Sequence, residues 1–299
     1  MKPSHRTLQV AFLTALLFVL TACGGHTEKE QRSSAAFGGV HVSYLDTGKK
    51  DAQTLVFIHG WSSDTSFWRF QVSEFSRDYR VLVLDLPGFG RSGKPQDVAY
   101  TMRFFAGAVQ AVLADAGVQN PVLIGHSMGY AIVRQYLIDY PGTVKAVVNV
   151  DGAHFQIPPT LEEKKKFEDM VAAMLAAHEG PNREAAVRGF VETTFYGRTA
   201  PELQKEIMAT VFTADPYAAT SSLREMLRME QWEERSFEVP SLAIYAKNKN
   251  LPPNHGDYLR TVFPNLTYVE WDDIGHHIML EVPTRFNAVM RDYLESLPR

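Results

Sequence analysis

The segment Gly125-His126-Ser127-Met128-Gly129 joins a predicted strand to a predicted helix. Residues 121–124 form a short apolar run that is typical of a buried strand, and residues 130–140 carry apolar side chains at helical spacing. Glycine stands two residues before and two residues after the serine, and glycine permits close approach of neighbouring backbone because it has no Cβ. The pattern therefore predicts a sharp turn that projects the Ser127 hydroxyl beside the amides of a helix N-terminus.

The same order of strand and helix recurs along the chain and predicts an α/β fold. Most of the short apolar runs are apolar throughout, which is typical of parallel strands that are covered on both faces. The alternating segment at residues 40–45 predicts an additional edge strand in a hairpin. Ligands of such sheets bind at the carboxyl ends of the strands. The other predicted strands are residues 55–58, 81–84, 122–124, 144–150, 241–246 and 266–271.

A long helical stretch interrupts this alternation. Residues 154–236 are charged and helical in pattern, with predicted helices at 161–178, 182–195, 201–213 and 221–230. Because the stretch is too long for a simple loop, we interpret it as a helical cap inserted into the α/β core. The core then comprises residues 39–153 and 237–299, and the chain closes with a predicted helix over residues 283–297.

The N-terminal residues have the composition of an export signal. Basic residues precede an apolar run at residues 8–20, which is shorter than the roughly 20 residues that span a bilayer. The run ends in Leu20-Thr21-Ala22-Cys23, which resembles the lipobox of bacterial lipoproteins, and Cys23 is the single cysteine of the chain. We therefore expect a signal peptide at residues 1–22, a lipid on Cys23 and a flexible tether over residues 23–38. Glycines rather than aspartate follow Cys23, and by the sorting rule of the lipoproteins that this segment resembles, this implies the periplasmic side of an outer membrane.

The composition and the motifs of the chain limit its possible partners. The net charge of −4, without a basic tract, excludes nucleic acid as an expected partner. The histidines show neither the HExxH spacing nor the paired Cys/His spacing of metal sites, and no glycine-rich phosphate loop occurs. We accordingly expect no metal and no cofactor. The expected partners are a small-molecule acyl substrate and, through the N-terminal lipid, a membrane; the sequence specifies no oligomeric state.

Four landmarks in the chain from residue 40 onward resemble the α/β-hydrolase fold enzymes of the capped type. They are His59-Gly60-Trp61, the segment 85–92 (DLPGFGRS), the turn at Ser127, and Gly275-His276. All four occur in the order and at the spacing of that family. The resemblance implies an α/β-hydrolase fold, with a mostly parallel sheet, helices on both faces and an inserted helical cap.

The resemblance also assigns roles to individual residues. It implies that Ser127 is the nucleophile and that His276 is the base that accepts the serine proton. It places the oxyanion hole at the backbone N–H groups of Trp61 and Met128. His59 is expected to brace the loop that carries Trp61 rather than to move a proton.

The third member of the expected triad departs from the family pattern. The family usually carries an aspartate shortly after the strand at residues 241–246, where this chain has Lys247-Asn248-Lys249-Asn250. Asp151, at the end of the preceding strand, is the favoured replacement. Asn250 or Asn248 could instead orient the imidazole as a neutral amide. The remaining readings are an acid such as Asp257 or one in the cap, or a weak or inactive site.

These assignments predict a serine hydrolase that cleaves a small or medium carboxylic ester, a lactone or a related acyl compound. Ser127 would form an acyl-enzyme, and His276 would then activate the water that releases the acid. Two alternatives remain open at this point. One is C–C bond hydrolysis or perhydrolysis on the same fold. The other is an inactive binding lipoprotein, for which the missing aspartate is the argument.

Overall fold

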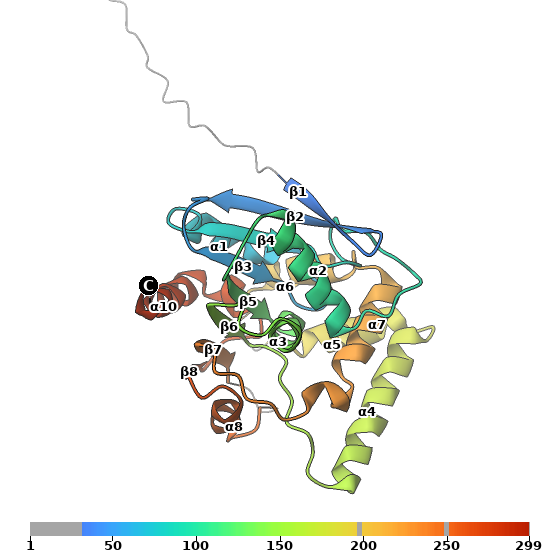
Figure 1. Cartoon of the computed structure of the whole chain (residues 1–299). Helices are drawn as coiled ribbons and strands as arrows, with labels where there is room; N and C mark the ends of the chain where they lie inside the picture. Colours follow the sequence, from blue (N-terminus) through green and yellow to red (C-terminus); the bar gives the residue numbers. More distant parts are fainter. Residues whose placement is uncertain (1–31, 196–198, 248–250, 299) are drawn as a thin grey trace, which may run out of the picture.

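The computed structural model describes residues 32–195, 199–247 and 251–298. An eight-stranded sheet forms its centre (Figure 1). The strand order is β1-β2-β4-β3-β5-β6-β7-β8; β2 pairs antiparallel with β1 and β4, and all other neighbours are parallel. This sheet confirms the predicted fold class. The strands are β1 (Arg32–Phe37), β2 (Val40–Gly48), β3 (Thr54–Ile58), β4 (Arg80–Leu84), β5 (Val122–His126), β6 (Ala146–Val150), β7 (Ser241–Ala246) and β8 (Leu266–Trp271).

The central strands are those that the sequence marks most clearly. Every residue of β3, β5, β6 and β7 is buried, as expected of strands that are apolar on both faces. The edge strand β8 is mostly half-buried or exposed, which fits its alternating sequence.

The N-terminal edge corrects one sequence prediction. Residues 32–37 were expected to belong to a flexible tether that extends to residue 38, but they form β1 and pair with β2 in a hairpin. Ala35 is buried opposite Val42, and the Phe37 ring packs against the tilted ring of Phe104 with centroids 5.3 Å apart. Pairing and packing order this segment although its own sequence is mostly small and polar. The predicted signal peptide and Cys23 lie outside the described residues.

Two groups of helices belong to the core. The helices α2 and α3 pack on each other, whereas α1 packs with α9 and α10. In Figure 1 the two groups lie on opposite sides of the sheet. The core helices are α1 (Arg69–Phe75), preceded by the 3₁₀-helix η1 (Thr65–Trp68), α2 (Met102–Asp115), α3 (Met128–Asp139), α8 (His255–Val262), α9 (Ile278–Glu281) and α10 (Pro283–Ser296).

A helical cap separates β6 from β7. Its longest helix, α4, begins with a capping box in which Thr160 and Glu163 satisfy each other's backbone amides. This helix buries just His178, and it lies at the outer side of the molecule in Figure 1. The cap consists of α4 (Leu161–Glu179), α5 (Arg183–Glu192), α6 (Pro201–Val211), α7 (Pro216–Met226) and the 3₁₀-helix η2 (Met229–Trp232).

Hydrogen bonds fasten the cap to the core. The Trp61 indole donates from Nε1 to the Ala219 carbonyl at 2.7 Å. The buried Arg134 guanidinium donates to the carbonyls of Gln231 and Glu233, each at 2.5 Å. These contacts hold α7 against the loop after β3 and the end of the cap against α3. Within the described residues, no helix combines the length and the apolar character needed to cross a membrane.

Candidate active site

Ser127 occupies a tight turn between β5 and α3. Its backbone has φ 53° and ψ −121°, a strained conformation for a residue with a side chain. The turn demands glycine on both sides. A Cβ at Gly129 would lie 2.3 Å from the Ile58 carbonyl oxygen, and one at Gly125 would lie 2.6 Å from the Gly129 backbone. The sequence motif therefore has the steric basis that was predicted for it.

The backbone of Ser127 is tied to the end of β6. Its N–H donates to the Val150 carbonyl at 3.1 Å, and its carbonyl accepts from the Ala153 N–H at 3.0 Å. Asp151 lies between these two partners, with φ 43° and an exposed fraction of 7%. The strand pairing of β5 with β6 thus places Asp151 beside the serine turn.

The Asp151 carboxylate binds two partners. Its Oδ1 accepts from the Ala246 N–H at 2.9 Å, and its Oδ2 accepts from Nδ1 of His276 at 2.5 Å. The structure therefore brings together Asp151 and His276, the favoured pair among the readings of the sequence. Asp257 instead pairs with Arg260 at 3.0 Å on the exposed face of α8. Asn248 and Asn250 lie outside the described residues.

The backbone of His276 is fixed at both ends. Its N–H donates to the Thr194 carbonyl at 3.1 Å, and its carbonyl accepts from Nε2 of His126 at 3.0 Å. The rings of His126 and His276 lie 4.6 Å apart between centroids. Burial lowers the pKa of His126 well below its ordinary value, with further contributions from His276 and His277. His126 is therefore neutral near pH 7 and carries its proton on Nε2, where it can donate to His276.

The loop after β3 packs against the serine turn. A Cβ at Gly60 would lie 2.9 Å from Nδ1 of His126 and 3.1 Å from Cβ of Ser127. Trp61 follows in this loop, and Met128 is the first residue of α3, where helix geometry leaves the N–H without an intrahelical acceptor. The two predicted oxyanion donors thus belong to segments in contact with Ser127 or adjacent to it.

His59 braces the same loop. Its Nε2 accepts from the Leu86 N–H at 3.0 Å, so its Nδ1 carries the proton and donates to the Gly60 carbonyl at 2.8 Å. Burial lowers the pKa of His59, which keeps the ring neutral in this arrangement. These bonds fit the bracing role that the sequence predicts. The sequence did not reveal Thr194, which contacts His276 from the end of α5 and belongs to no recognisable motif.

Comparison with known proteins identifies the family. The sequence model described as the alpha/beta hydrolase fold matches residues 53–283. The chain belongs to the α/β hydrolase fold family. A mouse (lyso)-N-acylphosphatidylethanolamine lipase is 24% identical over 280 residues, which cover 83% of this chain and 81% of the lipase.

Two solved structures share the architecture of this chain. An esterase from Exiguobacterium antarcticum matches with a TM-score of 0.77 and 19% identity, over 89% of this chain and 100% of the esterase. Est816, an N-acyl homoserine lactone degrading enzyme, matches with a TM-score of 0.74 and 23% identity, over 87% of this chain and 99% of its own. At these identities the likeness shows the fold alone. Membership of the α/β hydrolase fold family supports a hydrolase.

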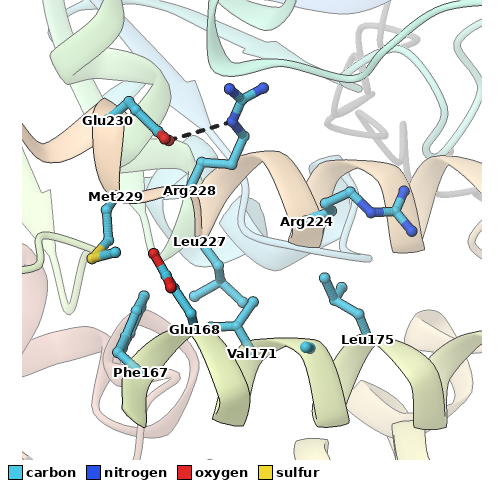
Figure 2. Close-up of a pocket in the computed structure, with 10 residues that line it drawn as sticks. Phe167, Glu168, Val171, Leu175, Arg224, Leu227, Arg228, Met229 and Glu230 are labelled. Atoms are coloured by element: carbon cyan, nitrogen blue, oxygen red, sulfur yellow. Dashed lines mark ion pairs between the residues drawn. The ribbon is translucent and has the colours of Figure 1, made fainter. Parts of the chain in front are cut away.

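A pocket in the cap of this α/β hydrolase fold protein is separate from the serine turn. It has a volume of about 270 Å³ and lies between α4 and the α7–η2 segment (Figure 2). Arg228 and Glu230 pair at 3.5 Å at its edge. Every lining residue belongs to the cap, and Ser127, Asp151 and His276 are not among them. Its apolar side chains are Phe167, Val171, Ala172, Leu175, Leu227 and Met229.

Among the described residues, no group of three or more His, Cys, Asp or Glu side chains is placed to hold a metal ion.

Proposed function

We propose that the protein is a serine hydrolase that cleaves a small or medium carboxylic ester or lactone through an acyl-enzyme on Ser127. The observation that carries this proposal is the 2.5 Å hydrogen bond between His276 Nδ1 and Asp151. It supplies an acid partner for the histidine although the aspartate usual in the family is missing. The strained Ser127 turn adds support, because its backbone bonds to residues on both sides of Asp151 and it therefore lies at the same strand ends.

Each group has one chemical task in this reaction. With Nδ1–H donated to Asp151, the neutral imidazole of His276 has its lone pair on Nε2, where it can accept the Ser127 proton. Asp151 then stabilises the imidazolium that forms. The N–H groups of Met128 and Trp61 bind the oxyanion of the tetrahedral intermediate. After the alcohol leaves with the proton from His276, a water deprotonated by the same imidazole releases the acid and restores Ser127.

The relatives and the cap both support the proposed substrate class. The relatives named above include an esterase and a lactone-degrading enzyme, which supports an ester or lactone carbonyl as the reacting group. The segment beside the oxyanion donors is aromatic: the Trp61 ring packs edge-on against Phe190 of the cap at 5.3 Å and against His178 at 6.0 Å. These contacts support an acyl group of limited size with apolar character.

The decisive experiment compares the full chain with Ser127→Ala. Hydrolysis of short p-nitrophenyl esters and covalent labelling by a fluorophosphonate are measured on both proteins. We expect both activities in the wild type and neither in the variant. Labelling without ester hydrolysis would favour C–C bond hydrolysis or perhydrolysis on the same serine. A folded wild type that shows neither activity would favour the binding lipoprotein.

We further propose that the protein is exported and anchored by a lipid on Cys23 to a bacterial membrane, at the periplasmic side of the outer membrane. The support is the Leu-Thr-Ala-Cys segment after a short apolar run. Cell fractionation of wild type and Cys23→Ser tests this. We expect the variant to leave the membrane fraction. An unlipidated chain, verified by mass spectrometry, that stays membrane-bound would overturn the anchor.

A further inference from the structure

One carboxylate accepts the backbone amides on both sides of His276. The Glu281 side chain turns back from the end of the short helix α9 toward the loop that precedes it. Its Oε2 accepts from the Gly275 N–H at 3.0 Å, and its Oε1 accepts from the His277 N–H at 3.3 Å. A Cβ at Gly275 would lie 2.4 Å from Oε1 of Glu281, so this close approach requires glycine at position 275.

Two cap residues contact this loop as well: one binds the Glu281 carboxylate, and the other binds the His276 N–H. Thr199, which follows α5 and is 4% exposed, donates its hydroxyl to Oε2 of Glu281 at 3.0 Å. The Thr194 carbonyl accepts the His276 N–H at 3.1 Å. Each of the three successive backbone N–H groups from Gly275 to His277 therefore donates either to Glu281 or to a cap residue.

His277 adds a side-chain bond to the cap. The Thr194 hydroxyl donates to the Val191 carbonyl at 2.6 Å, so it can only accept from Nε2 of His277, which lies 3.3 Å away. Burial lowers the pKa of His277 well below its ordinary value, with a further contribution from His276. The His277 ring is thus neutral, with its proton on Nε2, and it holds the loop to the cap without adding a charge beside His276.

We propose that Glu281 is a positioning residue that fixes the His276 loop for catalysis, and that Thr199 connects this loop to the cap. This inference rests on the proposed function, because it concerns the base of that reaction. The Glu281 carboxylate sets the orientation of the peptide units on either side of His276, and thereby the angle at which its imidazole meets Asp151. Through Thr199 and Thr194, a movement of the cap is transmitted directly to the base.

The hydrogen bonds of Glu281 predict which substitutions disturb the His276 loop. Glu281→Gln keeps the size of the side chain but replaces one accepting oxygen by an NH₂ group. That group would face a backbone N–H, which also donates, so at least one loop bond is lost. Thr199→Val keeps the shape of the threonine and removes the hydroxyl that donates to Glu281. Thr199→Ser retains the hydroxyl and should restore the connection.

The test measures kcat and KM for a short p-nitrophenyl ester on the full chain, together with the proton NMR signal of the His276 Nδ1–H that binds Asp151. We expect Glu281→Gln to lower kcat by about 10- to 100-fold with little change in KM, because small displacements of a reacting group cost rates of this size. We expect the Nδ1–H signal to shift or broaden. Thr199→Val should show a smaller loss of kcat in the same direction, and Thr199→Ser should recover the wild-type value.

Two control variants remove cap-to-core contacts that do not touch the His276 loop. Glu206→Gln disrupts the pairing of a cap carboxylate with Arg69, which lies at 2.8 Å. Tyr217→Phe removes a hydroxyl that donates to the Val98 carbonyl at 3.0 Å. Both should keep the wild-type kcat and the wild-type Nδ1–H signal. If they change these quantities as much as Glu281→Gln and Thr199→Val do, the effect is general to cap docking and the proposal is overturned.

The NMR signal separates failure of this inference from failure of the proposed function. It reports the Asp151–His276 bond in the folded protein and can be recorded in Ser127→Ala, where no catalysis is expected. A wild-type kcat and an unchanged signal in folded Glu281→Gln would overturn the inference. If Glu281→Gln does not fold, the comparison of Thr199→Val with Thr199→Ser decides, and equal kcat in these two variants overturns it. The wild type could also be inactive while Glu281→Gln still changes its Nδ1–H signal. That result would overturn the proposed hydrolysis but would support Glu281 as the residue that positions His276.

Discussion

Oδ2 of Asp151 and Nδ1 of His276 meet at 2.5 Å although the two residues lie 125 positions apart in the chain. The strand β7, after which the family usually carries its aspartate, ends at Ala246, and the Ala246 N–H donates to the same Asp151 carboxylate at 2.9 Å. The neighbouring strand β6 thus supplies the carboxylate, and the end of β7 supplies a donor that orients it. Under the proposed function, β6 rather than β7 therefore carries the acid partner of the His276 imidazole.

Replacing Asp151 by asparagine tests this contact. Because one Asp151 oxygen accepts from Ala246, the new amide would keep its oxygen there and turn its NH₂ group toward Nδ1 of His276. His276 would then carry its proton on Nε2 and could not accept the Ser127 proton. We expect Asp151→Asn to lower kcat/KM for p-nitrophenyl esters by about 10³-fold or more.

The exposed Asp257 provides the control for that measurement. Its substitution by asparagine removes a carboxylate that pairs with Arg260 on the surface, and we expect wild-type kcat/KM. A loss of less than about tenfold in Asp151→Asn would remove Asp151 from the reaction, because a triad acid contributes far more.

The parts of the molecule that local sequence determines were predictable. The serine turn could be predicted because its strand, glycines and helix are contiguous in the chain. The central strands could be predicted because burial on both faces leaves a continuous apolar run. The strand β1 could not be predicted, since its small and polar residues gain their order from pairing with β2. The Asp151–His276 contact remained one of several alternatives, and Glu281 and Thr194 were missed, because these contacts depend on how separate segments fold together.

The glycine that follows the serine turn should not tolerate a methyl group. The Cβ of Gly129→Ala would lie 2.3 Å from the Ile58 carbonyl oxygen and 2.7 Å from that of His59, both in backbone that cannot easily move. We expect a loss of about 3 kcal/mol or more in the free energy of unfolding, measured in urea.

Replacing a second glycine by alanine should instead raise the free energy of unfolding, measured in the same way. Gly189 is exposed on the helix α5, and nothing lies within 4 Å of a Cβ built there. Gly189→Ala should therefore raise the free energy of unfolding by about 0.5 to 1 kcal/mol. Equal stability of the two alanine variants would contradict the steric account of the turn.

The buried His154 should make the protein sensitive to acid. Its ring packs against Trp232 at 5.4 Å and Tyr258 at 5.7 Å, and burial, followed by Arg134 and His255, lowers its pKa to about 3. Between this value and the ordinary pKa near 6.5, the unfolded chain binds a proton that the folded protein does not. The free energy of unfolding should therefore fall as the pH falls through this range, by about 1.4 kcal/mol per pH unit from this group.

Urea unfolding between about pH 6 and pH 4 measures this slope. We expect His154→Phe to have a shallower dependence on pH than the wild type, because phenylalanine binds no proton. The exposed His41 offers the control, and His41→Asn should keep the wild-type slope. If His154→Phe and the wild type lose stability in parallel, the acid sensitivity originates elsewhere.

Arg134 should hold the end of the cap in place. Its buried guanidinium donates to the carbonyls of Gln231 and Glu233, each at 2.5 Å, and lies 5.7 Å from the Trp232 ring. Arg134→Met would leave these carbonyls without their donor, at an expected cost of about 2 to 4 kcal/mol. We expect faster limited proteolysis near residues 231–240 and a higher KM, because the cap end would detach from α3.

Arg103→Met, which removes an exposed ion pair with Asp139 at 3.1 Å, should be cleaved at the wild-type rate. Equal cleavage of both variants would mean that other contacts hold the cap.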